Sequence, residues 1–245
     1  ESPANAVSVL AIMRQAVAKA YAYVEEIEFV TLTDANIKVV DMPAVNRGSA
    51  VAYCDAPGPL EASPQPTYIA IAPGPASEEG SASFYCEYNA TMLHLLALHE
   101  AVPGHALQLA HASRAPERSS MRAMCSSGVL CEGWAMYAEE EFVHRGFAAI
   151  DSERGRLAIK LQELKMQARM AINAILDVRV HSMDMTNEEG MQLMEFRGFQ
   201  EAAEAAGKWR RCLLSAGQLS TYFVGYRAIR SLFQDLRVLH PDWSD

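Results

Sequence analysis

The sequence predicts a mainly helical α+β fold in which a small β element precedes the central helix. Beyond about Asn89, apolar residues recur at helical spacing in nearly every segment, whereas β-branched pairs cluster before it. The chain has 245 residues, of which 50% are apolar and 21% charged, as in folded proteins that bury a substantial core. We therefore expect one domain over residues 1–245, with a helix and β/loop region at 1–88 and a helical region at 89–245.

Residues 1–88 hold one helix and all of the predicted strands. Residues 5–27 carry apolar positions at helical spacing without a breaker, so they predict a helix that packs one face on the core. Residues 28–33 and 37–40 read as two short strands joined by a turn. Residues 43–82 hold most of the prolines and read as a loop that contains one strand, 68–72. That strand is either an ordinary member of a sheet or an edge strand along which a peptide substrate lies extended.

The remaining chain is expected to be helical. Apolar periodicity predicts helices over residues 90–110, 130–147, 152–183, 187–206 and 208–236.

Charge and hydropathy exclude two classes of function. The chain has 21 Lys+Arg against 30 Asp+Glu, a formal charge of -9, so no basic field attracts nucleic acid. No apolar run approaches the roughly 20 residues of a membrane-spanning helix. The chain starts at Glu1 without an initiator methionine, so we expect a processed product or the C-terminal part of a larger protein, and no compartment is indicated.

The most informative segment is His99-Glu100-Ala-Val-Pro103-Gly104-His105. In an HExxH helix, two histidines four residues apart hold zinc and the adjacent glutamate acts as general base. Here the second histidine comes two residues later, which on a regular helix turns it about 240° from the first. Pro103 and Gly104 favour a break between the histidines, because proline removes a backbone donor and glycine permits unusual dihedrals. The sequence therefore predicts an interrupted helix that brings His99 beside His105.

A zinc site of this kind needs a third protein ligand, and Glu132 is the candidate. It opens the segment Glu132-Gly-Trp-Ala-Met-Tyr-Ala-Glu139, which places acids among apolar neighbours on a helix. The acid run Glu139 to Glu141 reads mainly as a solvated face, and Glu139 is its one member whose helical stripe allows an inward position that orients a ligand histidine. The alternatives are a hydrogen-bonded polar cluster on a kinked helix and, for Glu132, an ordinary acid near a helix N-terminus.

Together these segments resemble the DUF885 family of bacterial proteins, whose motifs run HEA-x-PGH-x-x-Q and EGWA-x-Y-A-E. The resemblance covers roughly residue 40 to the end, which corresponds to the C-terminal half of family members. It implies a largely helical, zincin-like metallopeptidase fold of the gluzincin type. It also implies that His99, His105 and Glu132 bind one zinc ion and that Glu100 is the catalytic base.

Two later segments extend the resemblance. Asp177-Val-Arg-Val-His181 is similar to a D-x-x-x-H segment of the family, and Gly217 to Gly225 is similar to its PGQ-x-x-x-Y-x-x-G segment, except that Ala216 replaces proline. From spacing alone, Asp177 can hold the tautomer of His181 four residues later on a helix, and Arg169 and Asn173 continue that stripe.

Tyr222 lies within the second of these segments. It shares a helical face with Gln218, and its phenol is a suitable donor to a tetrahedral oxyanion. We therefore expect His181 and Tyr222 to stabilise the transition state; the alternatives are a surface histidine and a core tyrosine.

The sequence as a whole favours a zinc-dependent hydrolase that cleaves peptide or amide bonds, with residues 89–245 as its catalytic region. Two alternatives remain: a non-catalytic or partner-dependent metal-binding fragment, and a zinc enzyme of biosynthesis with a non-peptide substrate. The expected substrate is a peptide or small amide. If the chain is half of a larger protein, we expect an open groove at the zinc site and a homodimer or a separate N-terminal chain docked on helix 5–27.

Overall fold

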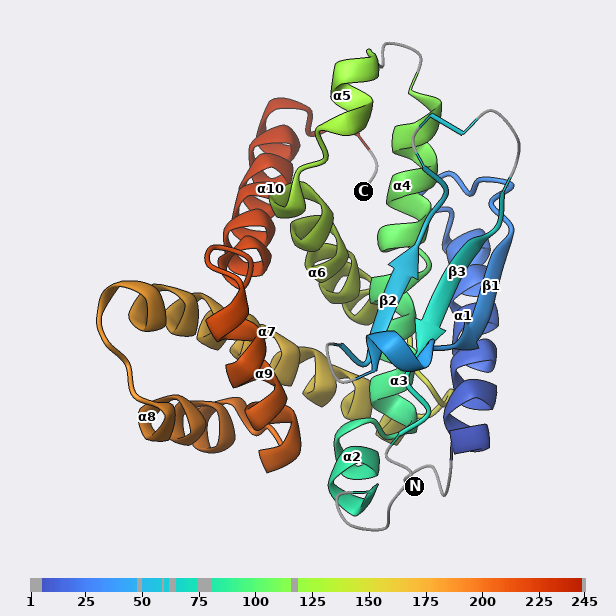
Figure 1. The fold of residues 1–245 in the computed structure, drawn as a ribbon. Coiled ribbons are helices and arrows are strands. Elements are labelled where there is room, and N and C mark those ends of the chain that lie inside the picture. Colours follow the sequence, from blue (N-terminus) through green and yellow to red (C-terminus); the bar gives the residue numbers. More distant parts are fainter. Residues whose placement is uncertain are drawn as a thin grey trace.

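The computed structural model describes residues 6–47, 50–58, 60–61, 65–74, 81–115 and 119–243. Most of these residues are helical, and a small sheet lies in the N-terminal third, which confirms the predicted α+β class (Figure 1). The sheet consists of β1 (Ile37–Asp41), β2 (Ala52–Asp55) and β3 (Thr67–Ile71). The α-helices are α1 (Ala6–Ile27), α2 (Ser81–Glu87), α3 (Ala90–Glu100), α4 (His105–Arg114), α5 (Ser120–Met124), α6 (Gly128–His144), α7 (Glu153–Ser182), α8 (Asn187–Gln192), α9 (Ala202–Leu214) and α10 (Ser220–Leu239).

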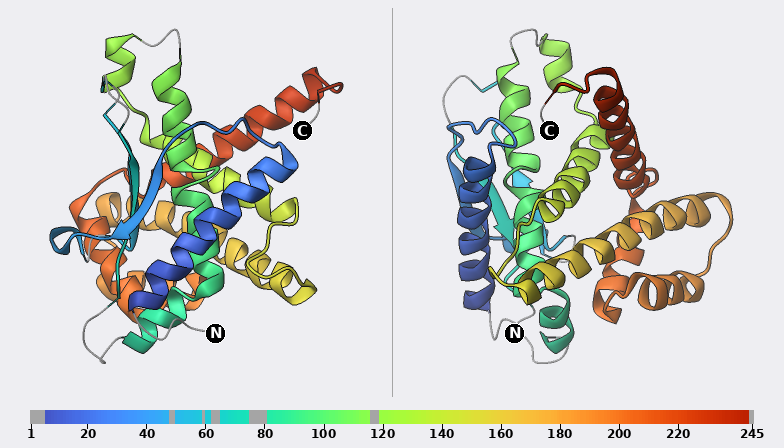
Figure 2. Two further views of the ribbon diagram at one scale, coloured as in Figure 1. Left: turned by 90° about the vertical axis from the view of Figure 1, so that its right-hand side faces the viewer. Right: turned by 180° about the vertical axis from the view of Figure 1, so that it is seen from behind.

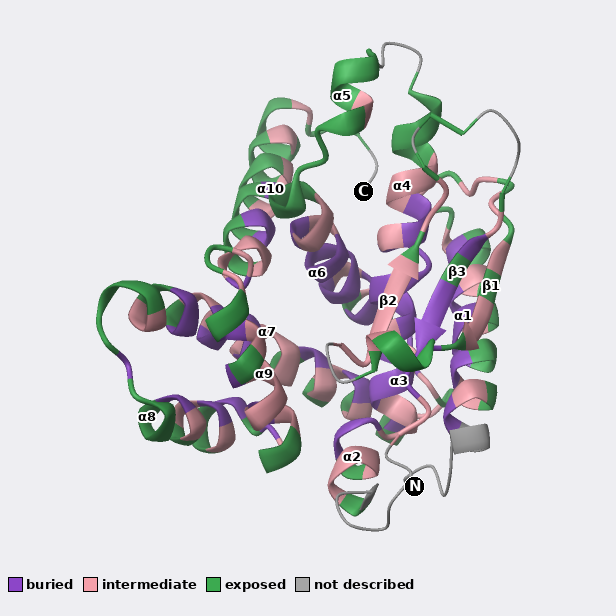
Figure 3. Cartoon of the chain, viewed as in Figure 1, coloured by how far each residue is buried: buried purple, intermediate pink, exposed green. Residues whose placement is uncertain are grey.

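Helix α3 is the centre of the packing. It contacts α1, α6, α7 and the strand β2, and the views in Figure 2 show α1 and α3 running side by side. Burial is concentrated where these elements meet, in α3, α6 and β3 (Figure 3). The main core cluster is therefore built from helices that also carry the candidate site.

Helix α1 places its apolar face inside this core. Val9, Met13, Ala16, Ala20 and Val24 are completely buried against α3 and the sheet. Burial of this stripe removes apolar area from water and stabilises the fold at roughly 25 cal/mol per Å². The expectation that α1 offers its apolar positions to a partner chain is therefore wrong, because the chain itself covers them.

The sheet has the order β1-β3-β2, with β1 parallel and β2 antiparallel to β3. The predicted strand at 68–72 is thus the central strand β3 and not an edge strand. The edge beside the candidate site is β2, which lies in the segment that proline content marked as a loop. Composition obscured β2 because it is short and half-buried.

The segment 28–33, predicted as a strand, is irregular. Its backbone carbonyls take side-chain donors in place of a strand partner: Tyr21 donates to the carbonyl of Thr33, and the His111 ring lies 2.7 Å from that of Thr31. Its apolar side chains pack on the core, which explains the β-like pattern.

Helix boundaries in the C-terminal part also differ from the prediction. The region 187–206 splits into α8, a π-helical turn at Leu193–Arg197 and the start of α9. The region 208–236 is interrupted between Leu214 and Ser220, where a turn separates α9 from α10. Among the described helices, none is both long and apolar enough to cross a membrane.

Candidate metal centre and pocket

His99 and His105 lie on the two sides of a break between α3 and α4. Helix α3 ends at Glu100, α4 begins at His105, and the amide of Gly104 donates to the carbonyl of Leu98 at 2.9 Å. A Cβ at Gly104 would overlap the carbonyl oxygens of Leu98 and His99, so this close approach requires glycine. The two imidazole rings meet edge to face, with centroids 4.7 Å apart. The interruption predicted from Pro103 and Gly104 is confirmed.

Glu132, near the start of α6, faces both histidines. Its Oε2 lies 3.5 Å from Nε2 of His99 and 3.4 Å from Nε2 of His105. Ligand atoms of the three residues lie within 4.8 Å of one another. Oε2 is buried and makes no hydrogen bond.

These spacings suit a metal ion better than a hydrogen-bonded cluster. Distances of 3.4 and 3.5 Å are long for hydrogen bonds. A tetrahedral zinc site with bonds of about 2.0–2.2 Å separates its ligand atoms by roughly 3.3–3.6 Å. The donor set of two imidazoles and one carboxylate is also one that zinc takes in catalytic sites.

Two residues of α6 support this arrangement from behind. The Glu139 carboxylate is 2.5 Å from Nδ1 of His99, which leaves Nε2 of His99 directed toward Glu132. The Trp134 indole donates to the carbonyl of Pro103 at 2.8 Å and so fastens the break between α3 and α4 to α6. Glu139 has the orienting position that its helical stripe predicts.

The electrostatics of the cluster favour positive charge between the carboxylates. Burial lowers the pKa of His99, but the carboxylates of Glu132 and Glu139 outweigh it and raise that pKa well above its ordinary value. Burial raises the pKa of Glu132, but His105 and His99 outweigh it and hold that pKa well below its usual range. The same field that attracts a proton here attracts a metal cation.

Helices α6 and α10 touch at two glycines, Gly133 in the segment 132–139 and Gly225 in the segment 217–225. A Cβ on Gly133 would overlap the backbone of Gly225, and a Cβ on Gly225 would overlap the carbonyl of Val129. This contact sets Glu132, the neighbour of Gly133, opposite Tyr222, which lies one turn before Gly225.

Glu100 and Tyr222 line the same pocket of about 790 Å³ as the three candidate ligands. Glu100 is buried and makes no hydrogen bond or ion pair with any described residue. The Tyr222 ring lies nearly parallel to that of His99, with centroids 6.5 Å apart. Burial, helped by the charge of Glu132, raises the pKa of Tyr222, so its phenol keeps its proton and can donate a hydrogen bond.

The structure does not bring His181 into this pocket. Nε2 of His181 is 2.9 Å from the carbonyl of Cys212 and 3.8 Å from Asp177, too far for a hydrogen bond with that carboxylate. Arg169 and Asn173, on the same stripe of α7, do line the pocket. His181 follows Arg169 by twelve positions, roughly 18 Å along a helix, which carries it past the site.

Asp177 anchors the start of α10 and does not orient His181. Its carboxylate accepts the backbone amides of Gly217 and Ser220, each at 2.8 Å, and the Ser220 hydroxyl at 2.7 Å. Burial raises the pKa of Asp177, but these hydrogen bonds outweigh it and hold that pKa below its ordinary value. The predicted role for this carboxylate is therefore wrong.

An Asp177→Asn substitution should lower the free energy of unfolding by about 1–3 kcal/mol at neutral pH, because it removes the charge from these hydrogen bonds. Since the folded pKa is lowered, this stability is present above the unfolded pKa and is lost as pH falls through the folded one. Urea unfolding at pH 7 and near pH 3 should show the difference from wild type shrinking with acid. Asp235→Asn, at an exposed position of α10, is the control, and an equal effect there would contradict the anchoring role.

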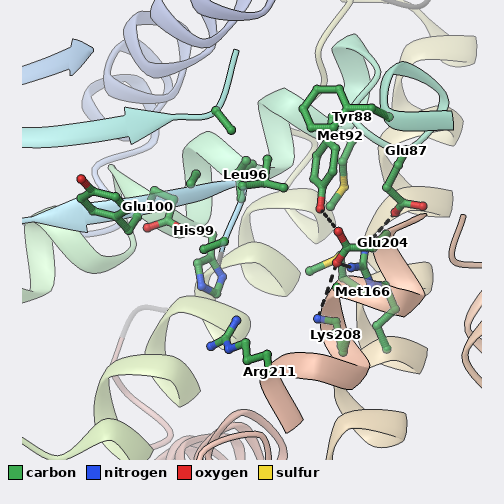
Figure 4. A pocket seen from close by; sticks show the side chains of 18 of the residues that line it. Glu87, Tyr88, Met92, Leu96, His99, Glu100, Met166, Glu204, Lys208 and Arg211 are labelled. Atoms are coloured by element: carbon green, nitrogen blue, oxygen red, sulfur yellow. Dashed lines mark hydrogen bonds and ion pairs between the residues drawn. The ribbon is translucent and has the colours of Figure 1, made fainter. Parts of the chain in front are cut away.

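Sequence reasoning missed a buried charged network at the other end of the pocket (Figure 4). Arg169 donates to Glu87 and to Glu204, each at 2.7 Å, and the Tyr88 hydroxyl donates to Glu204 at 2.7 Å. Lys165 adds an ion pair to Glu87 at 3.0 Å. The network joins α2, α7 and α9, and only the polar stripe of α7 gave a signal for it in the sequence.

Three further cations, Lys208, Arg210 and Arg211, line this pocket from α9, and Figure 4 labels Lys208 and Arg211. Figure 4 shows both side chains projecting from that helix, with the Arg211 guanidinium directed toward the His99 ring. They had no signal in the sequence, where residues 208–236 were predicted as one helix and no motif marked its first turns.

Comparison with known proteins agrees with the fold and with the family resemblance. The model of a family described as "Bacterial protein of unknown function (DUF885)" matches residues 1–242. A solved structure described as "a putative lipoprotein of unknown function" from Shewanella oneidensis has 31% sequence identity and a TM-score of 0.81; the match covers 97% of this chain and 41% of that one. Another, described as "the putative lipoprotein" from Colwellia psychrerythraea, has 21% sequence identity and a TM-score of 0.77; the match covers 97% of this chain and 38% of that one. No curated protein matches this chain.

Proposed function

This chain belongs to the DUF885 family, and we propose that it is a zinc-dependent hydrolase of peptide or amide bonds. One observation carries the proposal: His99, His105 and Glu132 converge within 4.8 Å, Oε2 of Glu132 is buried without a hydrogen bond, and Glu100 lines the same pocket. A buried carboxylate without a partner is costly unless a ligand, a proton or an ion completes it.

His99, His105 and Glu132 would hold the zinc ion, and Glu139 would fix the tautomer of His99. When bound, zinc acts as a Lewis acid toward a carbonyl oxygen and toward water. Glu100 follows His99 directly, so its carboxylate is held next to the ligands without being one of them. It would accept a proton from the attacking water and return it to the leaving amine.

Tyr222 would donate its phenolic proton in a hydrogen bond to the oxyanion that develops on the substrate. Its raised pKa keeps this donor protonated at neutral pH. Its place beside the His99 ring supports this role, whereas the position of His181 offers no support for the same role.

The edge strand β2 supports an extended peptide as substrate. Ala52, Tyr53 and Cys54 line the pocket, and among the described residues no strand pairs with the second edge of β2. Free backbone groups on such an edge can bind a peptide by adding it to the sheet.

The test is hydrolysis of a quenched-fluorescence peptide library by the purified chain. We expect turnover that is lost after treatment with a chelator and restored by one equivalent of zinc. Zinc binding without turnover of any peptide would contradict the hydrolase and leave the non-catalytic and biosynthetic alternatives.

The chain covers 41% and 38% of the length of the two solved relatives. We therefore also propose a partner, either a second copy of this chain or a separate N-terminal chain. Light scattering measures the mass of the assembly and tests this proposal.

A further inference from the structure

We propose that Arg211, assisted by Lys208, binds the C-terminal carboxylate of the substrate, so that the site cleaves short peptides one or two residues from their C-terminus. The inference rests on the proposed function and adds a substrate class to it. Its physical basis is a pair of pocket cations: Arg211 has no ion pair among the described residues, and Lys208 has only a long one, 3.7 Å from Glu204.

Arg211 is a half-buried guanidinium with only neutral partners. Its Nη2 donates to Oε1 of Gln218 at 2.9 Å and to the Tyr222 hydroxyl at 3.0 Å. No ion pair among the described residues includes Arg211. A guanidinium carries five donors in a planar fork that matches a carboxylate, and the two neutral contacts occupy only one nitrogen.

Lys208 is similarly under-neutralised. Its Nζ is 3.7 Å from Glu204, beyond hydrogen-bond distance, and that carboxylate already accepts from Arg169 and Tyr88. Burial, together with the charge of Arg169, lowers the pKa of Lys208 to about 8. An incoming anion would favour its charged form and would accept hydrogen bonds from its ammonium group.

The contrast with Arg169 separates a binding role from a structural one. Arg169 is paired with Glu87 and Glu204 at 2.7 Å each, so its charge is used within the fold. Lys208 and Arg211 lie three residues apart on α9, which places them on one helix face, and both line the pocket. Two such cations on one helix face, next to the candidate metal cluster, form a local anion site.

The spacing relative to the metal cluster sets the length of the leaving fragment. Arg211 is 3.0 Å from the Tyr222 hydroxyl, and the Tyr222 ring lies 6.5 Å from that of His99. An extended residue spans roughly 3.3–3.6 Å. A carboxylate on Arg211 would therefore lie one or two residues beyond a carbonyl held beside Tyr222 and His99.

The experiment measures peptide binding by calorimetry to zinc-loaded Glu100→Gln protein, which should cut peptides too slowly to disturb the measurement. The probes are N-acetyl-trialanine, its C-terminal amide, and the same amide with aspartate as the last residue. We expect the free acid to bind at least about tenfold more tightly than either amide, as for a hydrogen bond to a charged group. Adding Arg211→Gln should abolish this preference, Lys208→Gln should reduce it, and Arg211→Lys should retain part of it. Arg227→Gln, at an exposed position outside the pocket lining, should not change it.

Equal binding of acid and amide would overturn the proposal, and so would an Arg211→Gln variant that weakens both probes equally. If the aspartate amide bound as tightly as the free acid, the assignment to a C-terminal carboxylate would be wrong and a side-chain carboxylate would replace it. Hydrolysis by the wild-type chain without acid preference contradicts only this inference, whereas acid preference without hydrolysis contradicts only the proposed function.

Discussion

A Glu100→Gln variant is expected to bind zinc as the wild-type chain does and to hydrolyse peptides about 10³-fold more slowly, within the range measured for loss of a general acid–base. The amide keeps the shape of the side chain but cannot accept a proton. Glu100 lies outside the cluster of His99, His105 and Glu132, so metal content should stay at the wild-type level. The measurement is kcat/KM on a cleaved peptide together with zinc per chain.

The matched control is Glu25→Gln, at an exposed position of α1, which should leave both quantities unchanged. If Glu100→Gln lost the zinc as well, Glu100 would be a ligand. If it kept its turnover, another group would be the base, and either result contradicts the role given to Glu100.

Gly225→Ala is expected to destabilise the fold by about 3 kcal/mol, the upper part of the range for overpacking. The new methyl would meet the carbonyl of Val129 and the backbone of Gly133, and neither can move without separating α6 from α10. Because this contact sets Glu132 opposite Tyr222, zinc affinity should fall together with the melting temperature.

Gly207→Ala is the control, because here the same substitution is expected to stabilise the protein. Gly207 lies inside α9, and the nearest atom to its added Cβ is the end of the Arg210 side chain at 3.9 Å. Alanine should stabilise this helix by up to about 1 kcal/mol. Equal thermal stability of the two variants would contradict the close helix contact.

The candidate metal cluster could be predicted because its chemistry is local in sequence. Pro103 and Gly104 mark the break in the helix, and two histidines on its sides leave few arrangements other than a shared ion. The acid at Glu132 was found because a carboxylate in an apolar helix needs a partner. Glu139 could be placed as well, since its spacing from Glu132 is two helical turns.

The rest of the pocket depends on contacts between segments that are distant in sequence. Arg169 contacts Glu87 and Glu204, which are 82 and 35 residues away in the sequence. The hydrophobic periodicity of a segment does not predict contacts over such separations. The role given to Asp177 and His181 failed for a related reason. Their spacing permits a hydrogen bond on one helix, but the Asp177 carboxylate accepts hydrogen bonds from the backbone amides at the start of α10 instead.

The strands show the same limit. The segment 28–33 has the composition of a strand, yet side chains satisfy its carbonyls, whereas β2 looks like a loop and pairs with β3. Strand pairing is decided by the partner that is available, which a single segment does not reveal.

Zinc content of the purified chain decides whether His99, His105 and Glu132 form a metal site. Protein prepared without chelator, dialysed against metal-free buffer and measured by inductively coupled plasma mass spectrometry should carry one zinc ion per chain. His105→Ala and Glu132→Ala should carry none, while His144→Ala, outside the cluster, should keep the full amount. Zinc should also raise the melting temperatures of the wild-type chain and of His144→Ala, but not those of His105→Ala and Glu132→Ala. No stoichiometric zinc and no thermal shift with added zinc, or equal zinc in all four proteins, would contradict the account.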